Sequence, residues 1–101
     1  MVYVSHRYDG KYETTDNARR ILKRLQAEYP TDCFICPIFA FSHLGNKEMT
    51  FEQRRELRRD LISVFDYMIV ASDEDEYVIE DIEFANLIGM EVEYIEPSNS
   101  R

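Results

Sequence analysis

Residues 67–71 read Tyr67-Met68-Ile69-Val70-Ala71, an unbroken apolar run that decides the fold. A strand with one face in water alternates apolar and polar side chains, whereas a parallel strand covered by helices on both faces is apolar throughout. The run therefore predicts an inner strand of a parallel sheet with helices on both sides.

Shorter strand and helix patterns flank this run in regular alternation. The other expected strands are Val2–Ser5, Cys33–Cys36 and Glu91–Ile95. The expected helices run from Thr14 or Thr15 to Glu28, from the capping box Thr50-x-x-Gln53 to about Val64, and from about Tyr77 to Ile88, where Gly89 ends the last one. Because parallel crossovers are right-handed, this alternation predicts a three-layer α/β fold, flavodoxin-like or Rossmann-like, with about four parallel strands in the order 2-1-3-4.

Length and charge limit the possible partners. The 101 residues predict one domain over residues 1–96, followed by a loose tail, Pro97–Arg101. A domain of this size can gain stability by self-association, so a homodimer is possible. The formal net charge of −8 opposes binding to nucleic acid polymers and to anionic membranes. No run has the ~20 apolar residues of a membrane span, and no signal peptide is recognisable, so we expect a soluble cytoplasmic protein.

Neither the cysteines nor the acidic run predicts a metal site or a cofactor. Cys33 and Cys36 lie in a strand-like segment, where positions three apart point to opposite faces, and no second Cys/His pair accompanies them. The run Asp73–Glu76 lacks the glycine and the distal glutamate of a calcium loop. We therefore expect reduced thiols and a solvated acidic loop.

The loop after the first strand is the expected ligand site. In open parallel sheets, ligands bind beyond the carboxyl ends of the strands, where the strand order reverses. There Ser5, His6, Arg7 and Gly10 offer hydroxyl, imidazole, guanidinium and backbone N–H donors to a phosphate or a carboxylate. A plain polar loop, with Arg7 paired to a nearby acid, is an equal alternative, and we expect His6 and His43 to be solvated rather than functional.

Each of the later helices has an apolar stripe that is expected to face the sheet. The two stripes comprise Leu57, Leu61 and Val64, and then Val78, Ile82, Ala85, Ile88 and Gly89. Asp81 falls inside the second stripe, while Glu80 and Glu83 are expected to project away. A buried acid costs free energy unless it is paired or faces a wet cleft, so Asp81 is either functional or at a solvated edge.

Asp60 borders the first of these stripes, and a surface ion pair with Arg58 or Arg59 is the simpler interpretation. Two carboxylates meeting at one cleft would suit cleavage at the anomeric carbon of a sugar. Asp81 and Asp60 are therefore the candidate catalytic residues.

Several segments together resemble the nucleoside 2-deoxyribosyltransferase-like superfamily. They are Ser5-x-Arg7 with Gly10, then Arg59-Asp60-Leu61 before Asp66–Val70, and Glu80-Asp81-Ile82-Glu83-Phe84-Ala85 ending at Gly89. This superfamily includes small deoxynucleoside 5′-monophosphate N-glycosidases and short phage and bacterial relatives.

The resemblance implies a role for each matching residue. Asp81 falls at the position of the nucleophile, where the family has a glutamate. Asp60 falls at the acid that helps to bind the base or transfer a proton, and Ser5 and Arg7 fall in the phosphate-binding loop. The implied activity is that of an N-glycosidase or deoxyribosyltransferase acting on a nucleoside or its 5′-monophosphate. The alternative is a non-catalytic nucleotide-binding or protein-interaction module of the same fold. For catalysis, Asp81 and Asp60 should open into one pocket with Ser5 and Arg7 on its rim.

Overall fold

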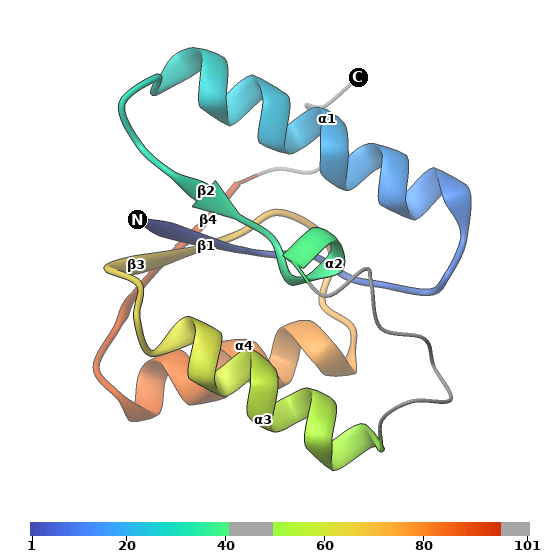
Figure 1. Cartoon of the computed structure of the whole chain (residues 1–101), viewed down its shortest axis with the longest axis vertical. Helices are drawn as coiled ribbons and strands as arrows, with labels where there is room; N and C mark the ends of the chain where they lie inside the picture. The colour runs from blue at the N-terminus through green and yellow to red at the C-terminus, as the bar shows by residue number, and fades with distance from the viewer. Residues whose placement is uncertain (41–49, 96–101) are drawn as a thin grey trace.

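The computed structural model describes residues 1–40 and 50–95 (Figure 1). In chain order, the elements are β1 (Val2–Ser5), α1 (Tyr12–Glu28), β2 (Phe34–Ile35), α2 (Pro37–Ala40), α3 (Phe51–Ile62), β3 (Tyr67–Val70), α4 (Glu76–Leu87) and β4 (Glu91–Tyr94). The four strands form one parallel sheet in the order β2-β1-β3-β4. The predicted fold class and strand order are confirmed.

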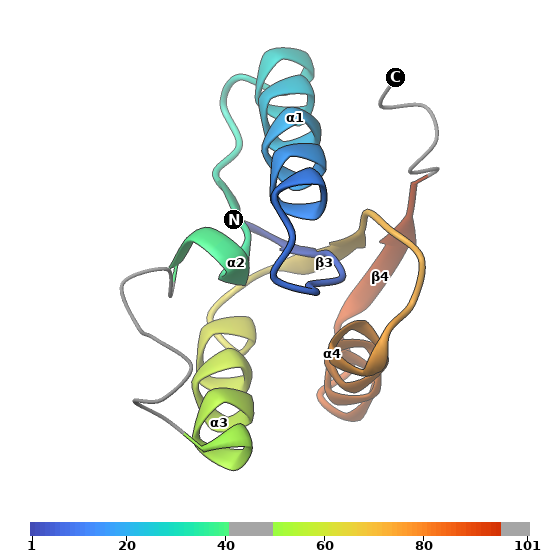
Figure 2. The same ribbon diagram turned by 90° about the vertical axis from the view of Figure 1, so that its right-hand side faces the viewer.

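The sheet has a separate hydrophobic core on each face. Figure 2 shows α1 on one face and α3 with α4 on the other. Because side chains alternate along a strand, Val2 and Val4 of β1 pack towards α1, whereas Tyr3 belongs to the core beneath α3 and α4. In β3, Ile69 and Met68 divide between the two cores in the same way, which explains why the run at residues 67–71 contains no alternation.

The helix ends agree with the sequence in two places and differ in two. The capping box at Thr50 is present, and Gly89 follows α4 with a φ of 75°. However, α1 begins at Tyr12, earlier than the predicted cap at Thr14 or Thr15; Lys11 is its N-cap and makes no side-chain cap hydrogen bond. Pro37 begins the short helix α2 instead of only closing a strand, since its fixed φ suits a first helical position.

Two predicted inward stripes need correction. In α3 the buried side chains are those of Arg58 and Ile62, whereas Val64 lies past the helix end and is 61% exposed. In α4 Val78, Asp81 and Ala85 are buried, but Ile88 is the C-cap and is exposed. Val64 and Ile88 lie two residues and one residue past their helix ends, so neither is buried with its stripe.

Other features can be stated for the described residues only. Within residues 1–40 and 50–95, no helix is both long and apolar enough to cross a bilayer. Cys33 is exposed and Cys36 is buried, as expected for opposite faces, and both are free thiols. Burial raises the pKa of Cys36 to about 12, so this thiol stays protonated and unreactive near neutral pH. His43 and the predicted tail, Pro97–Arg101, lie outside the described residues.

Candidate functional site

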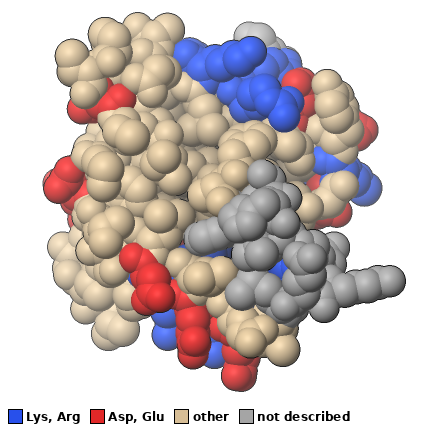
Figure 3. Space-filling model, in the orientation of Figure 1, with Lys and Arg blue, Asp and Glu red and all other residues tan. Residues whose placement is uncertain are grey.

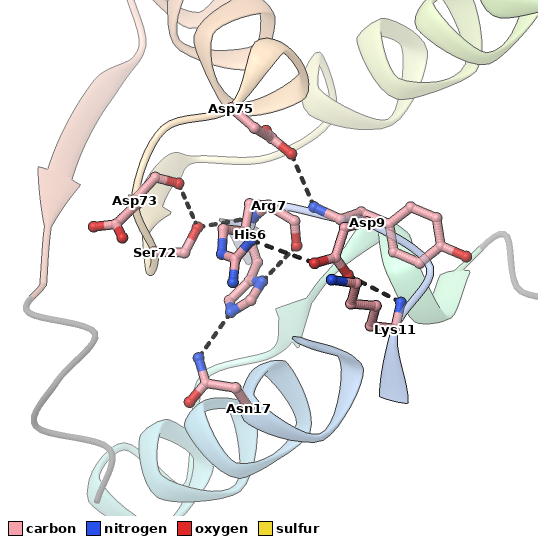
Figure 4. A network of polar contacts seen from close by, with 9 residues as sticks. His6, Arg7, Asp9, Lys11, Asn17, Ser72, Asp73 and Asp75 are labelled. Carbon is pink, nitrogen blue, oxygen red and sulfur yellow. Dashed lines mark hydrogen bonds and ion pairs between the residues drawn. The ribbon is translucent and has the colours of Figure 1, made fainter. Parts of the chain in front are cut away.

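The loop after β1 is tied to the loop after β3 by side chains of the second loop. The Arg7 N–H donates to Ser72 Oγ at 2.8 Å, and the Tyr8 N–H donates to Asp75 Oδ2 at 3.0 Å (Figure 4). Asp75 also caps α4 by accepting the Val78 N–H on its other oxygen at 2.9 Å. These two N–H groups of the first loop, which a phosphate could have taken, therefore already have protein acceptors.

From Arg7 to Gly10, the residues of the first loop are exposed. Arg7 is exposed and lies 3.5 Å from Asp9, so the predicted pairing with a nearby acid is present as a long contact. Asp9 has its pKa lowered by the Lys11 N–H and by the Thr14 hydroxyl, so it remains ionised. Gly10 has a φ of 79°, a conformation that glycine adopts at little cost, and it leads directly into α1.

His6 is buried, contrary to the expectation that it would be solvated. Its Nδ1 lies 2.7 Å from the Arg7 carbonyl oxygen, and its Nε2 lies 3.0 Å from Asn17 Nδ2. A neutral ring with its proton on Nδ1 satisfies both contacts, because Nδ1 donates and Nε2 accepts. Burial lowers the pKa of His6, which agrees with this neutral form.

Asp81 is buried and every oxygen of its carboxylate has a donor. Arg58 Nε donates to Oδ1 at 3.1 Å, while Ser5 Oγ and the Tyr3 hydroxyl donate to Oδ2 at 2.9 and 3.1 Å. Tyr3 and Ser5 reach the same oxygen because they are two positions apart in β1 and so point to the same face. The side chain of Asp81 is only 5% exposed.

Arg58 links Asp81 to a second acid and to an aromatic ring. Its Nη2 donates to Glu80 Oε1 at 2.7 Å, and its guanidinium carbon lies 5.0 Å from the centre of the Tyr77 ring. Arg55 extends the network with a longer contact to Glu80, 3.7 Å. Glu80 therefore faces α3, beside the buried stripe of α4 and not within it.

Opposing effects set the charges in this cluster. Burial raises the pKa of Asp81, while the Arg58 guanidinium and the hydrogen bonds from Arg58, Ser5 and Tyr3 oppose that rise. Burial lowers the pKa of Arg58, but the charge of Asp81 and the hydrogen bonds to Asp81 and Glu80 together outweigh burial and raise the pKa overall. Burial, followed by the charge of Asp81, raises the pKa of Tyr3, which keeps its hydroxyl a donor. The geometry is that of an ion pair with three donors on one carboxylate.

The structure brings together some of the predicted site residues and separates others. Ser5 contacts Asp81 directly. His6, the next residue in the chain, belongs to the separate polar network shown in Figure 4. Asp60 is exposed on α3, two residues beyond Arg58 and so on a different side of the helix from the Asp81 contact. Arg7 and Gly10 are likewise exposed. The expected pocket shared by Asp60 and Asp81 is not formed by these side chains.

Three important partners were not singled out from the sequence. Arg58 lies four residues before Ile62 and thus on the same helix face, but the predicted stripe of α3 did not include Ile62. Asp75 belongs to the acidic run that is expected to be a solvated loop, and no local pattern indicates that Ser72 and Asp75 accept N–H groups 65 and 67 residues away.

Among residues 1–40 and 50–95, no group of three or more His, Cys, Asp or Glu side chains is arranged to hold a metal ion. Comparisons with protein-family models, with curated proteins and with solved structures found no match to this chain.

Proposed function

We propose that this domain binds a small anionic ligand of the nucleotide type at the carboxyl edge of its sheet and does not cleave it. The observation that carries the proposal is the state of Asp81, which is buried, paired with Arg58 and hydrogen-bonded by Ser5 and Tyr3. A nucleophilic carboxylate must present an oxygen to the anomeric carbon, and three donors already occupy the two oxygens of Asp81. A second acid is also needed, and Asp60 lies exposed elsewhere on α3.

The ligand position follows from the topology and from the exposed groups of the first loop. The strand order reverses between β1 and β3, and ligands of open parallel sheets bind beyond the strand ends at that point. Arg7 and Lys11 have exposed cationic side chains there, and the rings of Tyr8 and Tyr12 are exposed beside them. Cations suit a phosphate, and tyrosine rings suit a nucleobase.

The negative net charge does not prevent an anion from approaching this side of the molecule. Lys and Arg side chains gather over α1 on the face shown in Figure 3. Exposed members of this helix include Arg19 and Arg20, although Asp16 pairs with both. Because screening confines electrostatic effects to about 8–10 Å, acids on the far side of the molecule have little effect on an anion at this face.

A second candidate function is favoured by one specific contact. The two positions that the family resemblance assigns to the nucleophile and to the phosphate loop, Asp81 and Ser5, lie 2.9 Å apart. In this alternative the domain is an N-glycosidase or deoxyribosyltransferase, and ligand binding frees one oxygen of Asp81 by turning the Ser5 and Tyr3 hydroxyls away.

A single panel of ligands separates the two functions. The full chain is incubated with deoxynucleosides and their 5′-monophosphates, binding is followed by calorimetry, and released base is followed by chromatography. We expect binding of the monophosphates without release of base. Release that is abolished by Asp81→Asn would overturn the non-catalytic proposal in favour of the glycosidase, and an absence of binding would reject both.

A matched pair of variants tests the role of Arg7. Arg7→Ala should weaken monophosphate binding by roughly 10- to 150-fold, the equivalent of one charge-assisted contact of about 1.5–3 kcal/mol, and leave nucleoside binding nearly unchanged. Lys23→Ala removes an exposed cation from the middle of α1, and it should leave both monophosphate binding and nucleoside binding unchanged. Equal losses for both ligands in Arg7→Ala would show that Arg7 does not contact the phosphate.

A further inference from the structure

A hollow of about 210 Å³ lies between α1 and strands β3 and β4, away from the first loop. It opens on the face of the sheet that carries α1, because Ile69 of β3 belongs to the core on that face. Its lining includes Leu25 and Ile69, which are buried, and Ile95, which is half-buried. The hollow is smaller than the roughly 300–1,000 Å³ of sites for drug-sized ligands, so a short ligand would fit.

The polar part of the lining is acidic. Glu28, Asp32 and Glu93 border the hollow, and Arg24 is the cation among its lining residues. Arg24 lies 3.8 Å from Glu28, so these two charges largely compensate each other. Asp32 and Glu93 then leave a negative potential over an apolar surface.

Two tyrosines complete the lining, and the pKa of one of them reflects the nearby negative charges. Tyr29 and Tyr67 both border the hollow. Burial raises the pKa of Tyr67, and the charges of Asp32 and Glu93 raise it further. Both acids therefore act on the same ring from different elements, and tyrosine rings themselves attract cations.

We propose that this hollow is a binding site for a small organic cation, an alkylammonium or alkylguanidinium with a short apolar body. The apolar body would lie on Leu25, Ile69 and Ile95, and the cationic head would lie between Asp32 and Glu93. The site shares no residue with the first loop, so it is independent of the proposed nucleotide site.

The test uses four probes of similar size and different charge. They are n-butylammonium, n-butylguanidinium, n-butanol and butyrate, titrated into the full chain while the backbone amide resonances are followed by NMR. We expect saturable shifts at Tyr67, Ile69 and Glu93 with the two cations, and none with the alcohol or the carboxylate. Equal shifts with n-butanol would show that the hollow is an apolar surface without preference for cations, and this would overturn the proposal. Shifts that do not saturate would also reject it.

Charge-removing variants localise the effect. Glu93→Gln and Asp32→Asn should each weaken cation binding about two- to fivefold, the range expected for one exposed ion pair. Glu83→Gln removes an exposed acid of α4 outside the hollow and should leave binding unchanged. An equal loss in Glu83→Gln would show that only the net charge of the protein attracts the probe, and would overturn the proposal.

Discussion

At the scale of single residues, the pair of Arg58 and Asp81 dominates the core beneath α3 and α4. Both side chains are at most 7% exposed, so neither charge can be solvated if the other is removed. Arg58→Met should therefore lower the free energy of unfolding by about 3–5 kcal/mol, because it leaves Asp81 buried without its counter-ion. Denaturant unfolding followed by circular dichroism measures this loss.

The double variant Arg58→Met/Asp81→Leu is the control for that experiment. Replacing both members of a buried pair by apolar side chains of similar size is often close to neutral. We expect the double variant to recover most of the loss, with a remainder from Glu80, Ser5 and Tyr3, which lose their partners. A loss below about 1 kcal/mol in Arg58→Met alone would mean that water reaches Asp81 in solution.

At the scale of elements, Asp75 connects α4 to the loop after β1. One carboxylate oxygen caps α4 through the Val78 N–H, and the other accepts the Tyr8 N–H. Asp75→Ala should cost about 0.5–2 kcal/mol of stability as a lost cap and should also speed hydrogen exchange at the Tyr8 amide. Thr50→Ala is matched to it, because it removes the cap of α3 at a similar cost and leaves Tyr8 untouched. Similar exchange at Tyr8 in both variants would show that Asp75 does not hold the first loop.

Element boundaries were predictable where a local signal sets them. Thr50, Gly89 and the run at residues 67–71 act through neighbours in the chain, so the capping box, the helix end and the buried strand could be read directly. The prediction that Val64 and Ile88 face the sheet was wrong, because apolar periodicity continues beyond the point where the backbone leaves the helix. For the same reason, helix ends are the least predictable part of a helix.

The candidate site was predictable only to the level of which elements carry it. The place of Asp81 among apolar residues singled it out but left open whether it is buried or at a solvated edge, whereas Ser5 followed from the topology of parallel sheets. That Arg58 is the partner of Asp81 could not be predicted, because Arg58 and Arg59 are equally plausible until the packing of α3 on α4 selects one face of α3. Long-range contacts of this kind depend on how whole layers are placed, and a local pattern contains no information on that.

At the scale of the whole molecule, the dependence of stability on pH combines several opposing effects. Lowering the pH reduces the repulsion that accompanies a net charge of −8. Asp81, whose pKa is raised in the folded state, contributes stability at low pH that is lost as the pH rises through its folded pKa. His6 acts in the opposite direction, because burial lowers its pKa in the folded state.

The contribution of His6 can be isolated by comparing the native chain with His6→Gln. In the unfolded chain His6 takes up a proton near pH 6.5, whereas the folded site resists protonation until its own lower pKa is reached. The native chain should therefore exceed His6→Gln in stability above pH 6.5, and this advantage should fall as the pH is lowered, by at most about 1.4 kcal/mol per pH unit. The effects of net charge and of Asp81 occur in both proteins and cancel in the difference.

Urea unfolding of both proteins between pH 5 and 8 measures this difference, and NMR titration of the imidazole provides an independent pKa. His43→Gln removes the other histidine of the chain and so assigns the resonance of His6. A stability difference that stays constant across this range, together with an imidazole titrating near 6.5, would mean that His6 is solvated. In that case its contacts with the Arg7 carbonyl and Asn17 would not hold the first loop against α1.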